Sequence, residues 1–511
     1  DMVMRQITND IRQEFEPKWT RRSMWYKSYL DARFPEVPAT LIELMSHQNF
    51  ADMMYGLDPN FRFTVGRSIY KGMARFLAER KGREVVIQPL AVKDFYIKKQ
   101  SSNTYRLSWE PTPDPLEKTA MPDKYVIMER NEGDLGFHKI AETSSTHYDV
   151  KVTDNQIHSF KIIAANAGGL SFPSEVLALC EGSNNAKPVL VVNGFTRLSG
   201  PAQVRDSKNA GFKADEEFGV PYIKDISFTG NQTEFNRNAG NRHGASGNSY
   251  ATKVIAGNTF DYAATHGDAI AETGYGFVSA SASAVEKGKV KLTDYSNVDL
   301  ILGKQKTTVV GNGKSGINYR AFPPELQKAI KSFLDKGGNL IISGQYVVSD
   351  LFDKRSNRED REFAEKVLGL TTIAEKERQQ RAEEEARAAE EERRRREALA
   401  NGDEESEVEE AAPTQRNTTT AARTSYTSVR KPDGRLLTSA GKTVNYSNTL
   451  NKDMYIVENP DILVPIQPEK AKKILTFSSN NLGAGYSMKS GKGNLTVLSV
   501  PLETIYDQSF L

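Results

Sequence analysis

A series of apolar runs between residues 186 and 370 leaves few folds open to this chain. "KPVLVVNGF", "YATKVIAGNTF", "VDLILGK" and "GGNLIISGQ" are apolar and strand-like, as expected of strands buried on both faces. Between the last two lies "FPPELQKAIKSFLDKGG", which begins with two prolines and ends near Gly337, as helices commonly do. Its apolar face consists of Leu326, Ile330, Phe333 and Leu334. Strand, helix and strand at this spacing predict a parallel α/β sheet with crossover helices.

A charged segment, residues 374–431, interrupts this domain. "AEKERQQRAEEEARAAEEERRRREALA" has almost no apolar face, but it repeatedly places glutamate four residues before arginine, as in Glu377–Arg381 and Glu392–Arg396. Each such pair adds roughly 0.2–0.5 kcal/mol to an isolated helix. We expect a solvated, partly formed helix and then a disordered tract. The mixed charge favours a solvated spacer, with a role in binding nucleic acid or a partner as the alternative. "NLTVLSVPLETIYD" within residues 432–511 is predicted to rejoin the sheet, which makes the charged segment an insertion.

Residues 88–182 have a different pattern. Aromatic and β-branched residues alternate with polar ones in "TYRLSWE", "KYVIMER" and "HSFKIIAAN", and turn residues separate such runs, which predicts an all-β sandwich. Trp109 and Tyr125 are expected to face its core. Cys180 is the single cysteine, so an intramolecular disulfide is impossible. Because it ends the strand-like run "SEVLALCEG", we interpret it as a buried structural residue rather than a nucleophile.

Residues 1–84 are predicted to form two helices around a short strand. Apolar residues recur every four positions at Val3, Ile7, Ile11 and Phe15, which indicates one apolar helical face. Residues 37–42 are short and apolar, which predicts a buried strand. The second helix is expected to end near residue 82. The apolar residues assigned to it are Phe63, Ile69, Met73, Phe76 and Leu77.

Composition and charge exclude some classes of function. The length of 511 residues suits three or four domains. The net charge is +2, so no overall field draws the chain to nucleic acid or to an anionic membrane. No apolar run of ~18 or more residues appears, so no membrane span is predicted. No signal peptide is visible, and we expect the chain to be a fragment or a processed form. Nothing in the sequence specifies an oligomeric state.

Polar residues after the predicted α/β strands form a candidate ligand site, because open α/β sheets bind ligands at the carboxyl ends of their strands. Thr196 and Arg197 follow the first strand, Asn258, Asp261, Tyr262 and His266 the second, and Gln345 and Ser349 the last. We expect Arg197, Asp261, Tyr262, His266 and Gln345 to converge on a carbohydrate or peptide. The alternative is that they are ordinary loop residues.

The stretch "PATLIELMSHQNFADM" resembles the last block of zinc-dependent N-acetylmuramoyl-L-alanine amidases of the bacterial cell wall. Pro38, Glu43 and Asn49 match that pattern, although Met45 and Ser46 stand where the family usually has Gly-Phe. The resemblance implies that Glu43 faces zinc and acts in general acid/base catalysis. The family's zinc ligands lie upstream of this block, and the residues before Glu43 contain no histidine. Zinc is therefore expected for the intact amidase, and no metal site is predicted in this chain. The alternative is an ordinary carboxylate at a strand end.

The stretch "HSFKIIAANAGGLSFPSEV" resembles the end of a fibronectin type III domain. Ala164, Asn166, Gly169, Ser171, Pro173 and Ser174 fit the family pattern. The tyrosine-corner position holds His158, which we expect to hydrogen-bond to the backbone in place of the tyrosine. Such domains are typically spacers or binding modules, so the resemblance implies no catalysis.

The α/β domain, residues 186–373 and 432–511, resembles flavodoxin-like folds of the type 1 glutamine amidotransferase-like group. The cues are "KPVLVVNGF", "ELQKAIKSFLDKGGNLIISGQY" and "GKGNLTVLSVPLETIYD". That group uses a cysteine nucleophile, and this domain has none, so amidotransferase chemistry is not predicted.

Together, the three resemblances imply the C-terminal part of a secreted, periplasmic or cell-surface bacterial protein, of a layout sometimes labelled xanthan-lyase-like. The expected function is peptidoglycan amide hydrolysis, with most of the metal site upstream of this chain. The alternative is a noncatalytic protein that binds peptidoglycan or another glycan.

Overall fold

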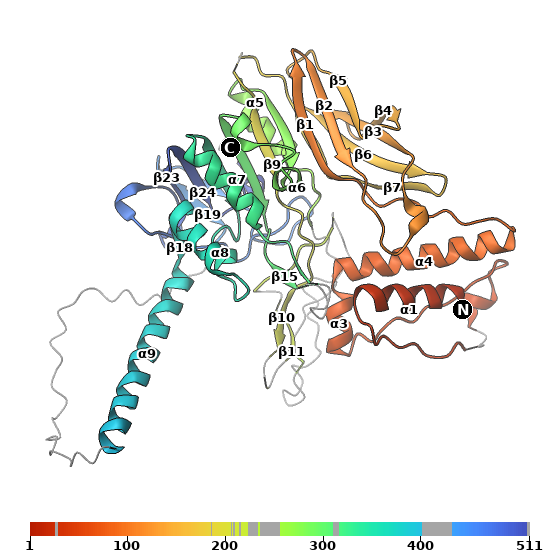
Figure 1. Cartoon of the computed structure of the whole chain (residues 1–511), viewed down its shortest axis with the longest axis horizontal. Helices are drawn as coiled ribbons and strands as arrows, with labels where there is room; N and C mark the ends of the chain where they lie inside the picture. Colours follow the sequence, from red (N-terminus) through yellow and green to blue (C-terminus); the bar gives the residue numbers. More distant parts are fainter. Residues whose placement is uncertain are drawn as a thin grey trace.

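The computed structural model describes residues 1–25, 29–184, 186–205, 207, 210–213, 216–222, 234–235, 256–309, 316–400 and 432–507. A helical N-terminal unit, a β-sandwich and an α/β sheet follow one another along the chain, and the long helix α9 projects from the α/β part (Figure 1). The predicted class, a multidomain protein with α/β and all-β parts, is therefore confirmed. Within these described ranges, no helix has the length and apolar character needed to cross a membrane.

The N-terminal unit contains α1 (Met2–Glu14), α2 (Leu30–Arg33), α3 (Phe50–Gly56) and α4 (Pro59–Arg80). Helices α1 and α4 lie side by side (Figure 1). The predicted apolar face of α1 is confirmed, because Ile7, Ile11 and Phe15 are buried against Phe61. An ion pair joins the two helices inside this core, where Lys71 Nζ lies 2.9 Å from Asp10 Oδ2.

Two expectations for this unit are wrong. Residues 37–42 form no strand, and Val37 and Leu41 are 67% and 49% exposed, because no neighbouring strand among the described residues pairs with them. The assigned face of α4 is also wrong for Met73 and Leu77, which are more than half exposed, although Ile69 packs on the core. The helix instead buries the face that meets α1, where the backbone approaches so closely that a Cβ on Gly72 would lie 2.7 Å from Val3 Cα.

The predicted β-sandwich is confirmed as two facing layers. One contains β1 (Lys93–Ser101), β2 (Thr104–Glu110) and β5 (His147–Lys151). The other contains β3 (Lys124–Asn131), β4 (His138–Thr143), β6 (His158–Asn166), β7 (Gly169–Pro173) and β8 (Leu177–Leu179). Trp109 and Tyr125 face the core as expected, with an edge-to-face ring contact at 5.4 Å. Cys180 is buried, and burial raises the pKa of its thiol to about 11, consistent with a structural residue.

His158 does not make the expected backbone hydrogen bond. Its Nδ1 lies 2.9 Å from Glu129 Oε1 and its Nε2 lies 2.9 Å from Asp154 Oδ1. The hydrogen bond with Glu129 is the main reason that the pKa of His158 is raised. The imidazole therefore acts as a cation between two carboxylates, a role that a tyrosine could not take.

The predicted parallel sheet is confirmed with five strands. They are β9 (Val189–Asn193), β13 (Phe277–Ser281), β14 (Asn297–Gly303), β17 (Asn339–Gly344) and β24 (Gly493–Leu498). All neighbouring pairs are parallel, and the spatial order β13-β9-β14-β17-β24 is 2-1-3-4-5 in chain order, one of the two common orders of doubly wound sheets. Helices α6 (Ala282–Glu286) and α7 (Pro324–Asp335) pack on one face, and α5 (Ala263–Glu272) packs on the other. The four predicted apolar residues of α7 are all buried.

Antiparallel strands extend this sheet on both sides. On one side β24 is followed by β23 (Gly483–Ser490), β22 (Ala471–Phe477), β19 (Arg435–Thr438) and β20 (Thr443–Asn445), while β18 (Leu370–Thr372) and β21 (Leu463–Pro465) attach through β23. Residues 432–507 therefore rejoin the domain as predicted. On the other side β13 pairs with β1 of the sandwich, with Tyr96 opposite Ala280. A single sheet thus runs from the sandwich into the α/β part.

Ion pairs also join the sandwich to the α/β part. Lys287 Nζ lies 2.5 Å from Asp94 Oδ2, and Lys289 pairs with Glu110. With the shared sheet, these contacts fix the two parts in one arrangement.

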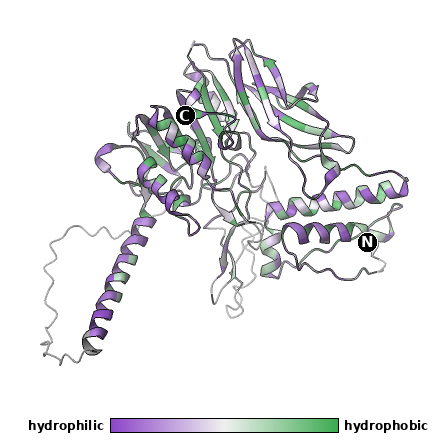
Figure 2. Cartoon of the chain, viewed as in Figure 1, coloured by the Kyte–Doolittle hydropathy of each residue, from purple (hydrophilic) through white to green (hydrophobic). Residues whose placement is uncertain are grey.

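The charged insertion begins as α9 (Ile373–Ala400). Figure 2 shows a mostly hydrophilic helix standing away from the apolar sheet. The expected pairs Glu377–Arg381 and Glu392–Arg396 are present. The predicted disordered tract, residues 401–431, lies outside the described residues, as do residues 250–255 of one predicted strand. The remaining short elements are β10 (Ala202–Arg205), β11 (Ala210–Lys213), β12 (Glu234–Phe235), β15 (Thr308–Val309), β16 (Ile317–Asn318) and α8 (Arg358–Glu362).

Candidate functional site

The loops after β9, β14 and β17 meet at the carboxyl edge of the α/β sheet. Strands β9 and β14 are neighbours there, but the chain leaves them toward helices on opposite faces, so this is the topological switch point at which such sheets bind ligands. Arg197, Lys304 and Gln345 come from these three loops and are 4%, 0% and 0% exposed. Glu217 and Glu458 reach the same place from elsewhere in the chain.

Ion pairs and hydrogen bonds connect the charged side chains at this edge. Arg197 Nη1 donates to Glu217 Oε2 (3.2 Å), and Lys304 Nζ lies 3.1 Å from Glu217 Oε1. Lys304 Nζ also donates to Glu458 Oε2 (2.7 Å). Tyr346 donates to Glu217 Oε2 (2.5 Å). Two cations and two carboxylates therefore neutralise one another, as buried charges must.

The electrostatics of this group, which we call the switch-point network (Arg197, Glu217, Lys304, Tyr346 and Glu458), follow from burial and charge together. Burial alone would raise the pKa of Glu217, but Arg197 and the neighbouring lysines hold it well below its usual range. For Glu458 the burial effect prevails over Lys304, and the pKa is raised. Burial and the nearby carboxylates raise the pKa of Tyr346, so it remains a neutral donor.

The structure brings two of the predicted site residues, Arg197 and Gln345, together at this edge. Gln345 Nε2 donates to the Tyr346 hydroxyl (2.9 Å), which in turn contacts the Glu217 carboxylate bound by Arg197. Thr196 lies beside them, with its backbone N–H bound to Gln305 Oε1 (2.9 Å). Ser349 lies further along the segment that follows β17, where its backbone N–H donates to Asp461 Oδ2 (2.8 Å).

Tyr262 and His266 belong to a second group at α5, which we call the histidine group and which also contains Asp299 and Glu503. His266 Nδ1 lies 2.6 Å from Asp299 Oδ2, and its Nε2 lies 3.1 Å from Glu503 Oε2. Burial alone would lower the pKa of His266, but these two carboxylates raise it to about 10. Tyr262 packs nearby, with its ring 5.8 Å from that of Tyr455. A cationic imidazole between two carboxylates is thus buried at this position.

Asp261 turns away from both groups and contacts the sandwich. Arg130 of β3 forms a two-pronged ion pair with it, at 2.8 and 3.0 Å. The structure therefore does not gather all five predicted residues in one place. It divides them among the switch-point network, the histidine group and the junction between the two parts.

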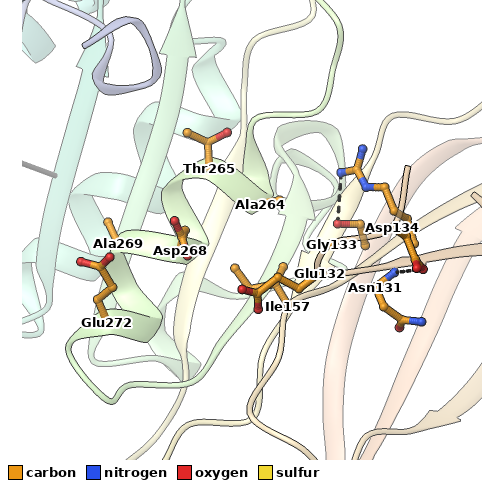
Figure 3. Close-up of a pocket in the computed structure, with 12 residues that line it drawn as sticks. Asn131, Glu132, Gly133, Asp134, Ile157, Ala264, Thr265, Asp268, Ala269 and Glu272 are labelled. Atoms are coloured by element: carbon orange, nitrogen blue, oxygen red, sulfur yellow. Dashed lines mark hydrogen bonds between the residues drawn. The ribbon is translucent and has the colours of Figure 1, made fainter. Parts of the chain in front are cut away.

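A cleft opens beside the Arg130–Asp261 pair. Its volume is about 340 Å³. One wall is the turn after β3, with Asn131, Glu132 and Asp134, and the other is the exposed side of α5, with Asp268 and Glu272 (Figure 3). Ile157 and Ala264 contribute apolar surface between these walls. Four carboxylates and one already paired arginine give the lining a negative charge.

Glu43, the residue implied by the amidase resemblance, lies exposed in the extended segment before α3. Asn49 caps that helix, accepting from Ala51 N at 2.9 Å. His47 is the nearest histidine in the sequence and is also exposed. No cluster of three or more His, Cys, Asp or Glu side chains that could hold a metal exists among the described residues. The residues around Glu43 therefore do not fit a zinc site.

Glu217, Lys304 and Glu458 are absent from the predicted set. The sequence does carry a signal for Lys304. It directly follows the apolar run "VDLILG", and this position marks it as a charged residue at the end of a buried strand. Glu217 and Glu458 lie in segments without a periodic pattern, so no local signal marks them.

Comparisons with known proteins found no matching family model and no matching curated protein. Solved structures do match parts of the chain. The C. elegans twitchin kinase region is 23% identical, with a TM-score of 0.16 over 17% of this chain and 16% of that one. The fibronectin type III domain of human fibronectin type III domain containing protein 3 is 22% identical, with a TM-score of 0.16 over 19% of this chain and 89% of that one. An FN3tt mutant is 24% identical, with a TM-score of 0.14 over 17% of this chain and 89% of that one.

Proposed function

We propose that this chain is a noncatalytic binding part of a secreted or cell-surface bacterial protein, and that it binds peptidoglycan or another envelope glycan. The observation that carries this proposal is the cleft between the β3–β4 turn and α5. In this proposal the sandwich is of the fibronectin type III kind. The α/β part is flavodoxin-like, which its 2-1-3-4-5 strand order supports.

The walls of the cleft favour a preformed site. The two parts share a sheet, and the Arg130–Asp261 pair joins them directly beside the cleft, so its width is set before a ligand arrives. Preformed clefts at domain junctions are common ligand sites. The carboxylates at the rim favour a ligand that carries amino groups, as the stem peptides of peptidoglycan do.

Titration calorimetry of the chain with soluble muropeptides that carry a free side-chain amine tests this proposal. We expect binding that weakens as salt rises from 50 to 500 mM, because exposed carboxylates attract a cation through screened charge. Asp268→Asn combined with Glu272→Gln should weaken it by about tenfold or more, at a loss of about 1.4 kcal/mol. Glu469→Gln, outside the cleft, is the matched control and should change nothing. Equal affinity in all three proteins would overturn the assignment of the cleft.

A second function, peptidoglycan amide hydrolysis by the intact protein, is favoured by one observation. Phe34, Val37 and Leu41 are 72%, 67% and 49% exposed in the segment that leads to Glu43. Several exposed large apolar side chains within one short segment favour a place where more protein packs. In this second proposal residues 1–84 belong to a larger catalytic unit, whose zinc would be held by residues other than those described here.

An amidase assay on muropeptides tests this second function. We expect no hydrolysis by the chain, with or without added zinc, because the described residues provide no metal-binding cluster beside Glu43. In the intact protein Glu43→Ala should abolish turnover while zinc content, measured by metal analysis, stays unchanged. Hydrolysis by the chain, or full activity of the substituted intact protein, would contradict this proposal.

A further inference from the structure

A groove of about 230 Å³ lies on the outer face of the sandwich, away from the cleft. Its walls and floor come from one row of residues across three strands. Tyr96 of β1 lies opposite Ser108 of β2, and Ser108 lies opposite His147 of β5. Directly paired residues of antiparallel strands share a face, so the small Ser108 side chain forms a floor between two rings. The strands that carry the two rings, β1 and β5, lie about two strand spacings, roughly 9.6 Å, apart.

Charged side chains close both ends of this groove, and each charge is already balanced. Arg106 forms a two-pronged pair with Asp149, at 2.7 and 2.8 Å. At the other end Lys289 pairs with Glu110. The groove therefore carries no net charge, unlike the cleft. It presents guanidinium and ammonium donors beside carboxylate acceptors, and these groups surround the aromatic ring of Tyr96.

Neighbouring side chains hold the Tyr96 ring in place. Lys98 Nζ lies 5.3 Å from the centroid of the Tyr96 ring and donates to the Lys289 carbonyl oxygen (2.6 Å). Trp109 also borders the groove, but it follows Ser108 on β2, so its side chain faces the core and not the groove.

We infer that this groove, lined by Tyr96, Ser108, His147, Arg106 and Glu110, is a binding site for a neutral saccharide unit. A pyranose ring has an apolar C–H face that stacks on an aromatic ring and a rim of hydroxyls that both donate and accept hydrogen bonds. The aromatic side chains on either side of the small Ser108 floor suit stacking of such a ring, and the paired donors and acceptors suit uncharged hydroxyls. An anionic or cationic ligand would have to compete with the ion pairs already formed.

The inference does not depend on the cleft, because the two lining sets share no residue. Three soluble tetramers serve as probes in titration calorimetry of the whole chain. They are β-1,4-linked N-acetylglucosamine, which is neutral, its deacetylated cationic form, and an anionic galacturonate oligomer. We expect binding of the neutral tetramer with little dependence on salt. Binding of only a charged tetramer, or of none, would overturn the assignment.

Variants locate the binding. Tyr96→Ala should weaken binding of the neutral tetramer by about tenfold, and Tyr96→Phe, which keeps the ring, should bind within about threefold of the unsubstituted chain. His147→Ala provides a second test at an exposed position if Tyr96→Ala lowers stability. Lys151→Ala, on the same strand but outside the groove, is the matched control. Retained affinity in both Tyr96→Ala and His147→Ala would overturn the site, whereas cleft variants at Asp268 and Glu272 should leave this binding unchanged.

Discussion

Replacing Lys304 with methionine is expected to lower the free energy of unfolding by about 3–5 kcal/mol, the usual cost of removing one partner from a buried ion pair. The Lys304 side chain is 0% exposed and its Nζ lies near two carboxylates, those of Glu217 and Glu458. Methionine has a similar length and fills the space, so a cavity contributes little. The loss comes from leaving negative charge buried without its cation.

Urea denaturation followed by circular dichroism measures this effect. Lys306→Met is the matched control, because Lys306 is 37% exposed and lies 3.7 Å from the same Glu217. Its loss should cost less than about 1 kcal/mol. Lys304→Met combined with Glu458→Gln should recover part of the stability, since the second change removes the unpaired charge. Equal effects of the Lys304 and Lys306 variants would show that the switch-point network does not stabilise the fold.

Substituting His266 by glutamine should also destabilise the chain by about 3–5 kcal/mol at pH 7, because Asp299 and Glu503 would lose the cation between them. The carboxylates raise the pKa of His266 from an ordinary value near 6.5 to about 10 in the folded state. A raised pKa means that the folded state holds its proton more tightly than the unfolded state. The contribution to stability is therefore complete below about pH 6.5, and it is lost progressively as the pH rises toward 10.

Unfolding measured at intervals between pH 6 and pH 10 tests this linkage. The difference in stability between the unsubstituted chain and His266→Gln should shrink as the pH rises, by up to about 1.4 kcal/mol per pH unit for one proton. His47→Gln replaces an exposed histidine in the N-terminal unit and should change stability by less than about 0.5 kcal/mol at every pH. A difference that is constant across the range would mean that His266 is neutral in the folded chain.

These two buried groups bear on how the α/β part could work. Charge at the switch point is neutralised within the chain, through Arg197, Lys304, Glu217 and Glu458. Both candidate ligand sites lie instead around the junction with the sandwich, where the shared sheet and the ion pairs fix the geometry. The rigidity of this junction, rather than chemistry at the carboxyl edge, supports the proposed binding function.

Local pattern was enough to predict several elements. The spacing of Leu326, Ile330 and Phe333 predicted α7, and the alternation in "TYRLSWE" predicted a strand of the sandwich with Trp109 facing inward. The apolar runs predicted β9, β14 and β17, but not β13, and "NLTVL" correctly predicted the return to the sheet after the insertion. Each of these depends on hydrophobic periodicity within a few residues, which a sequence displays directly.

Only the tertiary structure decided which distant segments meet. Lys304 and Glu458 are 154 positions apart, and β1 pairs with β13 although the two strands belong to different parts of the chain. It also decided that α4 buries the face that meets α1, and that His158 lies between two carboxylates. Periodicity specifies the conformation of a segment and its apolar face, but edge pairing and ion pairing depend on the three-dimensional arrangement of separate elements. For that reason the sequence predicted Arg197 and Gln345 near the carboxyl edge, while the fold determined that the charge there is neutralised by Glu217, Lys304 and Glu458, which come from outside the predicted set.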